Sequence, residues 1–120
     1  MRLRVYIAGP LGKPRTERRG QNIRKAVNAG LELIQVGFAP LIPHLTGYAD
    51  PDDKLGREAW LEVCHAWVKA ADALLRIPGD SPGADMEEAW AKEAGVPIFT
   101  EIASLVKWST RLYGGKLQRR

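Results

Sequence analysis

The chain has 120 residues, of which 45% are apolar and 27% are charged. This size and composition fit one globular domain with a real hydrophobic core, and they exclude a disordered chain or a fibrous repeat. The net charge is +4, with basic residues in the first loop and at the C-terminus, a clustering that fits phosphate binding as well as a solvated surface.

The first part of the chain predicts a strand, a helix and a second strand. Residues 3–8 are short, apolar and partly β-branched, which indicates a strand buried on both faces. Apolar residues then recur at three- and four-residue spacing, which predicts a helix from about Thr16 to a stop at Gly37. A second strand follows over 38–43, and its prolines favour the edge of a sheet.

A polar stretch with glycine and proline, 44–54, separates the two halves and is either a lid over a site or a surface loop. The second half again alternates helices and strands. In chain order the pattern predicts a helix over 60–71, a strand that Asp72 opens over 73–77, a helix opened by 81–87, a strand over 96–100 and a last helix over 102–112.

The alternation of strands and helices predicts an α/β fold: a single-domain three-layer sandwich around a mainly parallel sheet, flavodoxin-like or Rossmann-like. We expect this domain to span residues 1–113 and residues 114–120 to form a flexible tail. No apolar run approaches the roughly 20 residues of a membrane span, and the first residues lack the apolar segment of a secretory leader, so we expect none. We therefore expect a cytoplasmic protein with no membrane partner.

The cysteine, histidine and tryptophan residues predict neither a metal site nor a nucleic-acid surface. Cys64 lies within a helical pattern, and we interpret it as a packing residue rather than a catalytic thiol. His44, Cys64 and His65 lack the paired spacing of metal ligands, so we expect no metal and no cofactor. The four tryptophans fall at helical spacing, which is typical of a core or a subunit contact and disfavours nucleic-acid binding.

The most distinctive motif is the turn that opens the helix at 81–87. Ser81 and the backbone of Gly83 and Ala84 are suited to bind a phosphate or a hydroxyl group, because they precede a helix at the carboxyl edge of the sheet. Glu87, one helical turn further on, can face the same space. An acidic residue in a first helical turn is also an ordinary partner of the helix dipole, so the motif alone leaves the role of Glu87 open.

Two further residues are candidates near this edge. Asp72 at the start of a strand is a poor β-former and costly to bury without a partner or a function, although a turn residue after a helix would be unremarkable there. Two carboxylates with separate roles suit glycosyl chemistry. His44 follows the second strand, and it either reaches the ligand or belongs to a surface loop.

Three segments together resemble a known family. They are Val5-Tyr6-Ile7-Ala8-Gly9-Pro10, Ala71-Asp72-Ala73, and Ser81-x-Gly83-Ala84-x-x-Glu87-x-Ala89-x-Ala91 followed by Gly95-Val96-Pro97-Ile98. Over residues 3–100 this pattern is similar to the nucleoside 2-deoxyribosyltransferase superfamily, which includes deoxynucleoside 5′-monophosphate N-glycosidases. The resemblance implies that Glu87 is the nucleophile that takes the deoxyribosyl group, that Tyr6 hydrogen-bonds near it, and that Asp72 assists departure of the base.

The resemblance also bears on the substrate. Transferases of free nucleosides carry an aspartate six residues before the nucleophile, where this chain has Ser81, as in the branch that hydrolyses monophosphates. The first loop adds Gly9, Pro10, Lys13 and Arg15, and the two cations reinforce a phosphate preference. Asp80 and Asp85 flank the turn, however, and oppose a phosphate or replace the missing aspartate, so the phosphorylation state stays open.

The expected function is therefore cleavage of the N-glycosidic bond of a 2′-deoxynucleoside or its 5′-monophosphate, by hydrolysis or by deoxyribosyl transfer. The resemblance further implies a homodimer or a larger homo-oligomer with a small-molecule substrate. The alternative is a non-catalytic module that binds and senses a nucleotide with the same loops.

Overall fold

In a computed structural model, which describes residues 1–113, four parallel strands form one sheet in the order β2-β1-β3-β4. The strands are β1 (Arg4–Ala8), β2 (Ala39–Leu41), β3 (Ala73–Arg76) and β4 (Ile98–Phe99). The predicted α/β fold with a parallel sheet is thus confirmed. The predicted tail, 114–120, lies outside the described residues.

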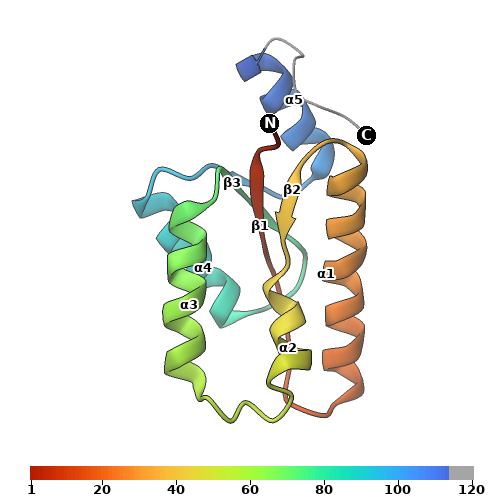
Figure 1. Ribbon diagram of the computed structural model, residues 1–120, viewed down its shortest axis with the longest axis vertical. Helices are drawn as coiled ribbons and strands as arrows, with labels where there is room; N and C mark the ends of the chain where they lie inside the picture. The colour runs from red at the N-terminus through yellow and green to blue at the C-terminus, as the bar shows by residue number, and fades with distance from the viewer. Residues whose placement is uncertain (114–120) are drawn as a thin grey trace.

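Helices cover both faces of this sheet (Figure 1). They are α1 (Glu17–Gln35), the short 3₁₀ turn η1 (Pro43–Leu45), α2 (Thr46–Ala49), α3 (Arg57–Ala70), α4 (Pro82–Glu93) and α5 (Ile102–Tyr113). The core around α1 and α5 lies on one face, and the core around α3 and α4 lies on the other. The three expected layers are therefore present.

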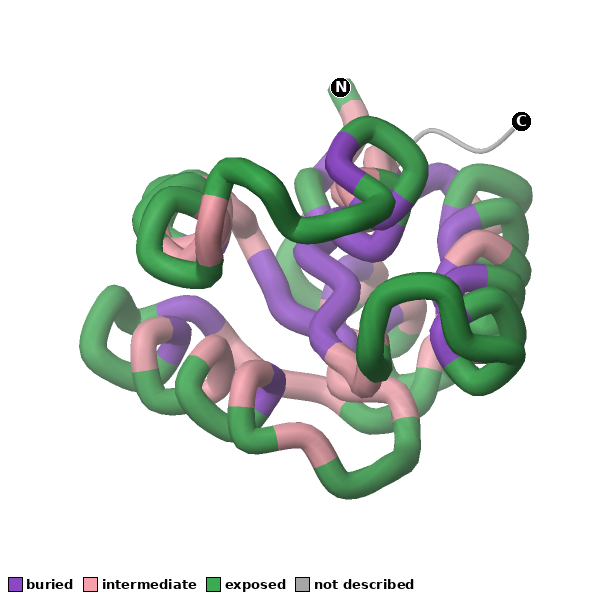
Figure 2. The backbone as a smooth tube through the Cα atoms, turned by 90° about the horizontal axis from the view of Figure 1, so that it is seen from below, coloured by how far each residue is buried: buried purple, intermediate pink, exposed green. Residues whose placement is uncertain are grey.

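Strand β1 lies in the middle of the molecule and supplies both cores, as the buried central trace in Figure 2 shows. Its side chains alternate between the two faces. Val5 and Ile7 pack with α1 and α5, whereas Tyr6 and Ala8 pack with α3 and α4. A tyrosine is thereby directed from the central strand toward α4, which carries Glu87.

The strand order creates a crevice between β1 and β3. The connection after β1 passes through α1 to β2 on one side, and the connection after β3 passes through α4 to β4 on the other. The two loops leave neighbouring strand ends, at Ala8 and Arg76, in opposite directions. Such a switch point at the carboxyl ends of the strands is where open α/β sheets bind ligands.

Two details differ from the sequence-based expectations. The first residues of the expected polar loop form η1 and α2, because Thr46 and the turn after Pro43 close helical hydrogen bonds. The third strand begins at Ala73 rather than at Asp72. The expected edge position of the proline-containing strand is confirmed, since β2 pairs only with β1 among the described strands.

Within residues 1–113 no helix has the length and apolar character to cross a membrane.

Candidate functional site

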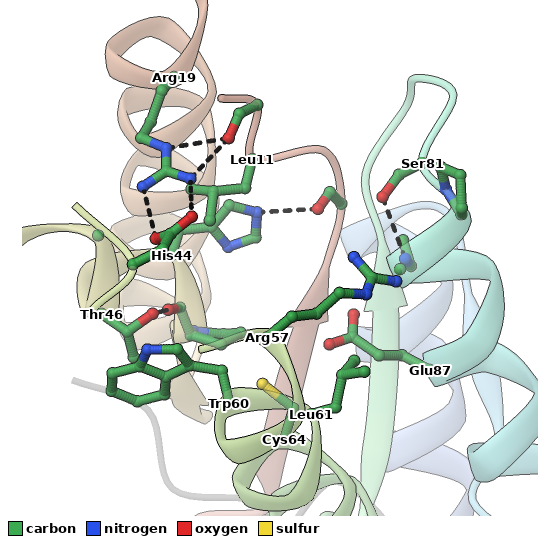
Figure 3. A pocket seen from close by; sticks show the side chains of 18 residues that line it. Leu11, Arg19, His44, Thr46, Arg57, Trp60, Leu61, Cys64, Ser81 and Glu87 are labelled. Atoms are coloured by element: carbon green, nitrogen blue, oxygen red, sulfur yellow. Dashed lines mark hydrogen bonds and ion pairs between the residues drawn. The ribbon is translucent and has the colours of Figure 1, made fainter. Parts of the chain in front are cut away.

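A cavity of about 430 Å³ opens at the carboxyl ends of the strands, at the switch point between β1 and β3. Its walls come from the loop after β1, from η1 and α2, from the first turns of α3 and from the beginning of α4 (Figure 3). A volume of this size is sufficient for a small ligand.

The carboxylate of Glu87 lies in the cavity wall and accepts a hydrogen bond from the hydroxyl of Tyr6. Tyr6 is on β1, completely buried, and 81 positions away in the chain. The pair forms because Tyr6 points to the sheet face that α4 covers and Glu87 stands one turn into α4. The structure thus brings these two predicted residues together.

Burial sets the protonation states of this pair. Loss of hydration raises the pKa of Glu87 to about 7, although the hydrogen bond from Tyr6 and the charge of Arg76 both act in the opposite direction. Burial, together with the neighbouring Glu87, raises the pKa of Tyr6 far above its usual range. Tyr6 is therefore a permanent neutral donor, while Glu87 is poised between acid and carboxylate near neutral pH.

The thiol of Cys64 is the third member of this group. Cys64 comes from α3, lines the cavity, and lies close enough to Tyr6 and Glu87 for both to influence the pKa of its thiol. Burial raises the pKa of the thiol, so it stays protonated at neutral pH and does not act as a nucleophile. The sequence analysis interpreted Cys64 as a packing residue and did not predict that it lies beside the Glu87 carboxylate.

The beginning of α4 forms the wall next to Glu87. The Ser81 hydroxyl caps the helix by accepting a hydrogen bond from the Ala84 amide at 3.0 Å, and Pro82 occupies the first turn. The Ser81 hydroxyl and the Gly83 amide belong to the N-terminal end of α4, where an anion is favoured. The predicted residues Ser81, Gly83 and Ala84 all line the cavity.

His44 also lines the cavity, and it is almost completely buried. Its Nε2 lies 3.2 Å from the carbonyl oxygen of Gly9, another predicted lining residue. A carbonyl only accepts, so Nε2 carries the proton and Nδ1 is an acceptor. Burial lowers the pKa of His44, which keeps the ring neutral. Among residues 1–113, no donor reaches Nδ1.

Asp72, in contrast, lies away from the cavity. It precedes β3 and accepts a hydrogen bond from the backbone amide of Arg4 at 2.7 Å, with the Arg4 guanidinium 3.3 Å away. Four residues of β3 separate it from the carboxyl edge, a distance of roughly 13 Å. The expectation that Asp72 lies near the edge that carries Glu87 is therefore wrong, because parallel strands begin and end at opposite edges of the sheet.

The basic residues predicted in the first loop are likewise outside the cavity lining. Lys13 is exposed, and Arg15 forms an ion pair with Asp52 through its Nη2 at 3.0 Å. Pro10 packs beside Gly79 rather than in the lining. These three residues do not contribute to the site as it stands in this structure.

Two other arginines, which the sequence analysis missed, line the cavity instead. Arg19 is buried and held by the carbonyl of Gly12 at 2.7 Å and by Asp53 at 3.2 Å. Arg57 extends from α3 toward Glu87 and the beginning of α4 (Figure 3), and it has no ion pair within residues 1–113. The signal for both is position, because each stands in the first turn of a helix that begins at the carboxyl edge.

The acidic residue Asp85, expected either to oppose a phosphate or to replace the missing aspartate, is turned away from this region. It pairs with Arg76 at 2.8 Å, and Glu88 contacts the same guanidinium at 2.6 Å. Asp85 is absent from the cavity lining. The beginning of α4 thus faces the cavity with its hydroxyl and amide groups rather than with this carboxylate.

The described residues hold no group of three His, Cys, Asp or Glu side chains suited to a metal ion. A scan of the chain against protein-family models and a search of curated proteins found no match. The arrangement itself offers a desolvated carboxylate with a fixed neutral donor, next to a helix end and an arginine. Such a site can bind a polar ligand with an anionic group and present a nucleophile or a base to it.

Proposed function

We propose that this protein cleaves the N-glycosidic bond of a 2′-deoxynucleoside 5′-monophosphate, with Glu87 as the nucleophile. The observation that carries the proposal is the contact between Glu87 and Tyr6 in the wall of a ligand-sized cavity at the switch point. Tyr6 orients one carboxylate oxygen and favours its ionised form, which leaves the other oxygen for attack.

In the proposed reaction the Glu87 carboxylate attacks the anomeric carbon of the sugar. A carbon–oxygen bond forms, the bond from carbon to the base nitrogen breaks, and the base leaves with the electron pair and takes a proton from solvent. Water then attacks the same carbon and gives up a proton to solvent, while the bond between the carbon and the Glu87 oxygen breaks, so the sugar is released and the carboxylate is restored. A second base in place of water would make the reaction a transfer, and both routes retain the anomeric configuration.

A phosphorylated substrate is favoured by the groups next to Glu87. The Ser81 hydroxyl, the Gly83 amide and the Arg57 guanidinium gather at the beginning of α4. A hydroxyl, an amide at a helix N-terminus and an arginine are all suited to phosphate oxygens. Asp85, which would repel a dianion, is paired with Arg76.

A second candidate function is a module that binds a nucleotide without cleaving it. The position of Asp72 favours this alternative, because the carboxylate expected to help the base depart is at the opposite edge of the sheet. The same cavity groups would hold the ligand in either case.

The test is incubation of the purified protein with a panel of deoxynucleosides and their monophosphates, followed by chromatography for free base. We expect release of base from the monophosphates, and its loss in Glu87→Ala. The matched control is Glu88→Ala on the same helix, whose carboxylate contacts Arg76. Thermal stabilisation by a nucleotide without release of base would instead support the binding module.

A further inference from the structure

Helix α3 presents a mixed face to the cavity in which Trp60 is the aromatic member. Arg57, Trp60, Leu61 and Cys64 all line the cavity. Their spacing of three and four residues places them on one side of the helix. Trp60 is half-buried, so its indole is part of the wall and is not sealed inside the core.

The indole of Trp60 is held in one orientation by Asp50. Its Nε1–H donates to a carboxylate oxygen of Asp50 at 2.8 Å. The same carboxylate accepts from the backbone amides of Lys54 at 2.8 Å and Leu55 at 3.0 Å. Asp50 is only 8% exposed. These hydrogen bonds lower the pKa of its carboxyl group, and the bond from Trp60 has the largest effect. The charged carboxylate therefore fixes both the loop and the ring at neutral pH.

The spacing along α3 relates Trp60 to the carboxylate. Cys64 neighbours Glu87 and lies one helical turn from Trp60. One turn is roughly 5 to 6 Å, so Trp60 lies about one turn further along the cavity wall than the residue beside Glu87. The beginning of α4, with Ser81, lies beside Glu87 away from Trp60 (Figure 3). A nucleotide with its phosphate at α4 would therefore direct its base toward Trp60.

We propose that the indole of Trp60, held by Asp50, is the surface against which the heteroaromatic base of the ligand packs. This inference rests on the proposed function for the position of the sugar at Glu87. A rigid indole offers a large flat contact to any base, so it recognises an aromatic ring and not a sugar phosphate alone. Trp60 is thus a positioning and specificity residue.

The experiment compares binding of a deoxynucleoside 5′-monophosphate and of deoxyribose 5-phosphate by calorimetry, in the Glu87→Gln background so that neither ligand is consumed. Trp60→Ala should weaken nucleotide binding by roughly ten- to a hundredfold and leave sugar phosphate binding unchanged. Trp60→Phe, which keeps a flat ring, should lose less affinity. The nucleotide affinity of Asp50→Asn should lie between that of Trp60→Ala and that of the background protein, because this substitution weakens the contact that orients the ring.

The matched control is Trp108→Phe, since Trp108 packs on Phe99 on the other face of the sheet, in the core around α1 and α5. It should bind both ligands as the background protein does. Unchanged nucleotide binding in Trp60→Ala, or equal losses for both ligands, would overturn the inference. Binding that depends on Trp60 without release of base by the wild type would instead refute the proposed function alone, and the absence of any nucleotide binding would overturn both.

Discussion

Two carboxylates, Glu87 and Asp72, lie at opposite ends of the same sheet and differ in almost everything but their charge. Glu87 stands at the carboxyl edge, is desolvated, and shares a hydrogen bond with a buried phenol in a cavity wall. Asp72 stands at the amino edge, where the amide and guanidinium of Arg4 satisfy it. The comparison teaches that the edge of a parallel sheet, not the residue type, decides which carboxylate is available for chemistry.

The largest expected effect is the loss of activity when Glu87 is replaced. Glu87→Gln keeps the size of the side chain but removes the nucleophile, so release of base should fall by at least about a thousandfold. Steady-state rates by chromatography give the measurement. Glu88→Gln on the same helix should stay within about threefold of the wild type, as expected for a residue outside the reacting group. Equal losses in both variants would indicate a general defect of α4.

Tyr6→Phe should have the next largest effect, because it removes the donor to Glu87 and keeps the packed ring. We expect a rate roughly ten- to a hundredfold lower. The hydrogen bond from Tyr6 lowers the pKa of Glu87, so its loss should also move the acid limb of the pH–rate profile to higher pH. A lower rate with an unshifted limb would mean that Tyr6 acts only through packing.

The pH dependence of the wild type follows from Glu87. Attack requires the ionised carboxylate, so kcat/KM should rise as pH passes through about 7. Stability should change in the opposite direction. The unfolded chain releases this proton near the ordinary pKa of glutamate, below the folded value, so folding loses free energy as pH rises from about 4.5 to about 7.

Thermal melts of Glu87→Gln check the sign of that linkage. The variant has no carboxylate to ionise, so it should gain stability relative to the wild type as pH rises, by on the order of 1 to 3 kcal/mol at pH 8. The difference between the two proteins should shrink toward pH 4.5. A difference that is constant with pH would show that Glu87 is not desolvated in solution.

The smallest effect is expected at the other edge of the sheet. Asp72→Asn weakens the hydrogen bonds to Arg4 and should lower the free energy of unfolding by about 1 kcal/mol. Denaturant titration measures this change. The rate of base release should remain within about twofold of the wild type, given the distance to the cavity. A large loss of rate with unchanged stability would return Asp72 to the chemistry and contradict the comparison.

Much of the fold could be predicted because it depends on local patterns. Short apolar runs alternating with helical spacing specify a parallel sheet, and the prolines around Pro40 place their strand at an edge. The meeting of Tyr6 and Glu87 was expected only from the resemblance, and the structure explains it by their positions, one on the central strand and one in the first turns of α4. The wrong expectation for Asp72 came from the motif Ala71-Asp72-Ala73 and its resemblance to a known family. A residue that opens a parallel strand lies at the amino edge of the sheet, away from the ligand.

The rest of the site could not be predicted because it depends on which turns of a helix extend beyond the sheet. Trp60, Cys64 and Val68 form one continuous apolar stripe in the sequence. In the structure Val68 is buried against the sheet, while the first two stand over the cavity. No spacing rule separates these two environments. The start of α3 marks Arg57 as a residue near the carboxyl edge, but the direction of its side chain depends on where α3 crosses that edge.

The central claim is that Glu87 attacks the anomeric carbon, and the stereochemistry of the product tests it most directly. The reaction is run in water containing methanol, and the methyl glycoside formed is identified by proton NMR. Two successive displacements through Glu87 predict the β-glycoside, with the configuration of the starting nucleotide retained. Formation of the α-glycoside would mean that Glu87 activates the acceptor in a single displacement, and it would contradict the account.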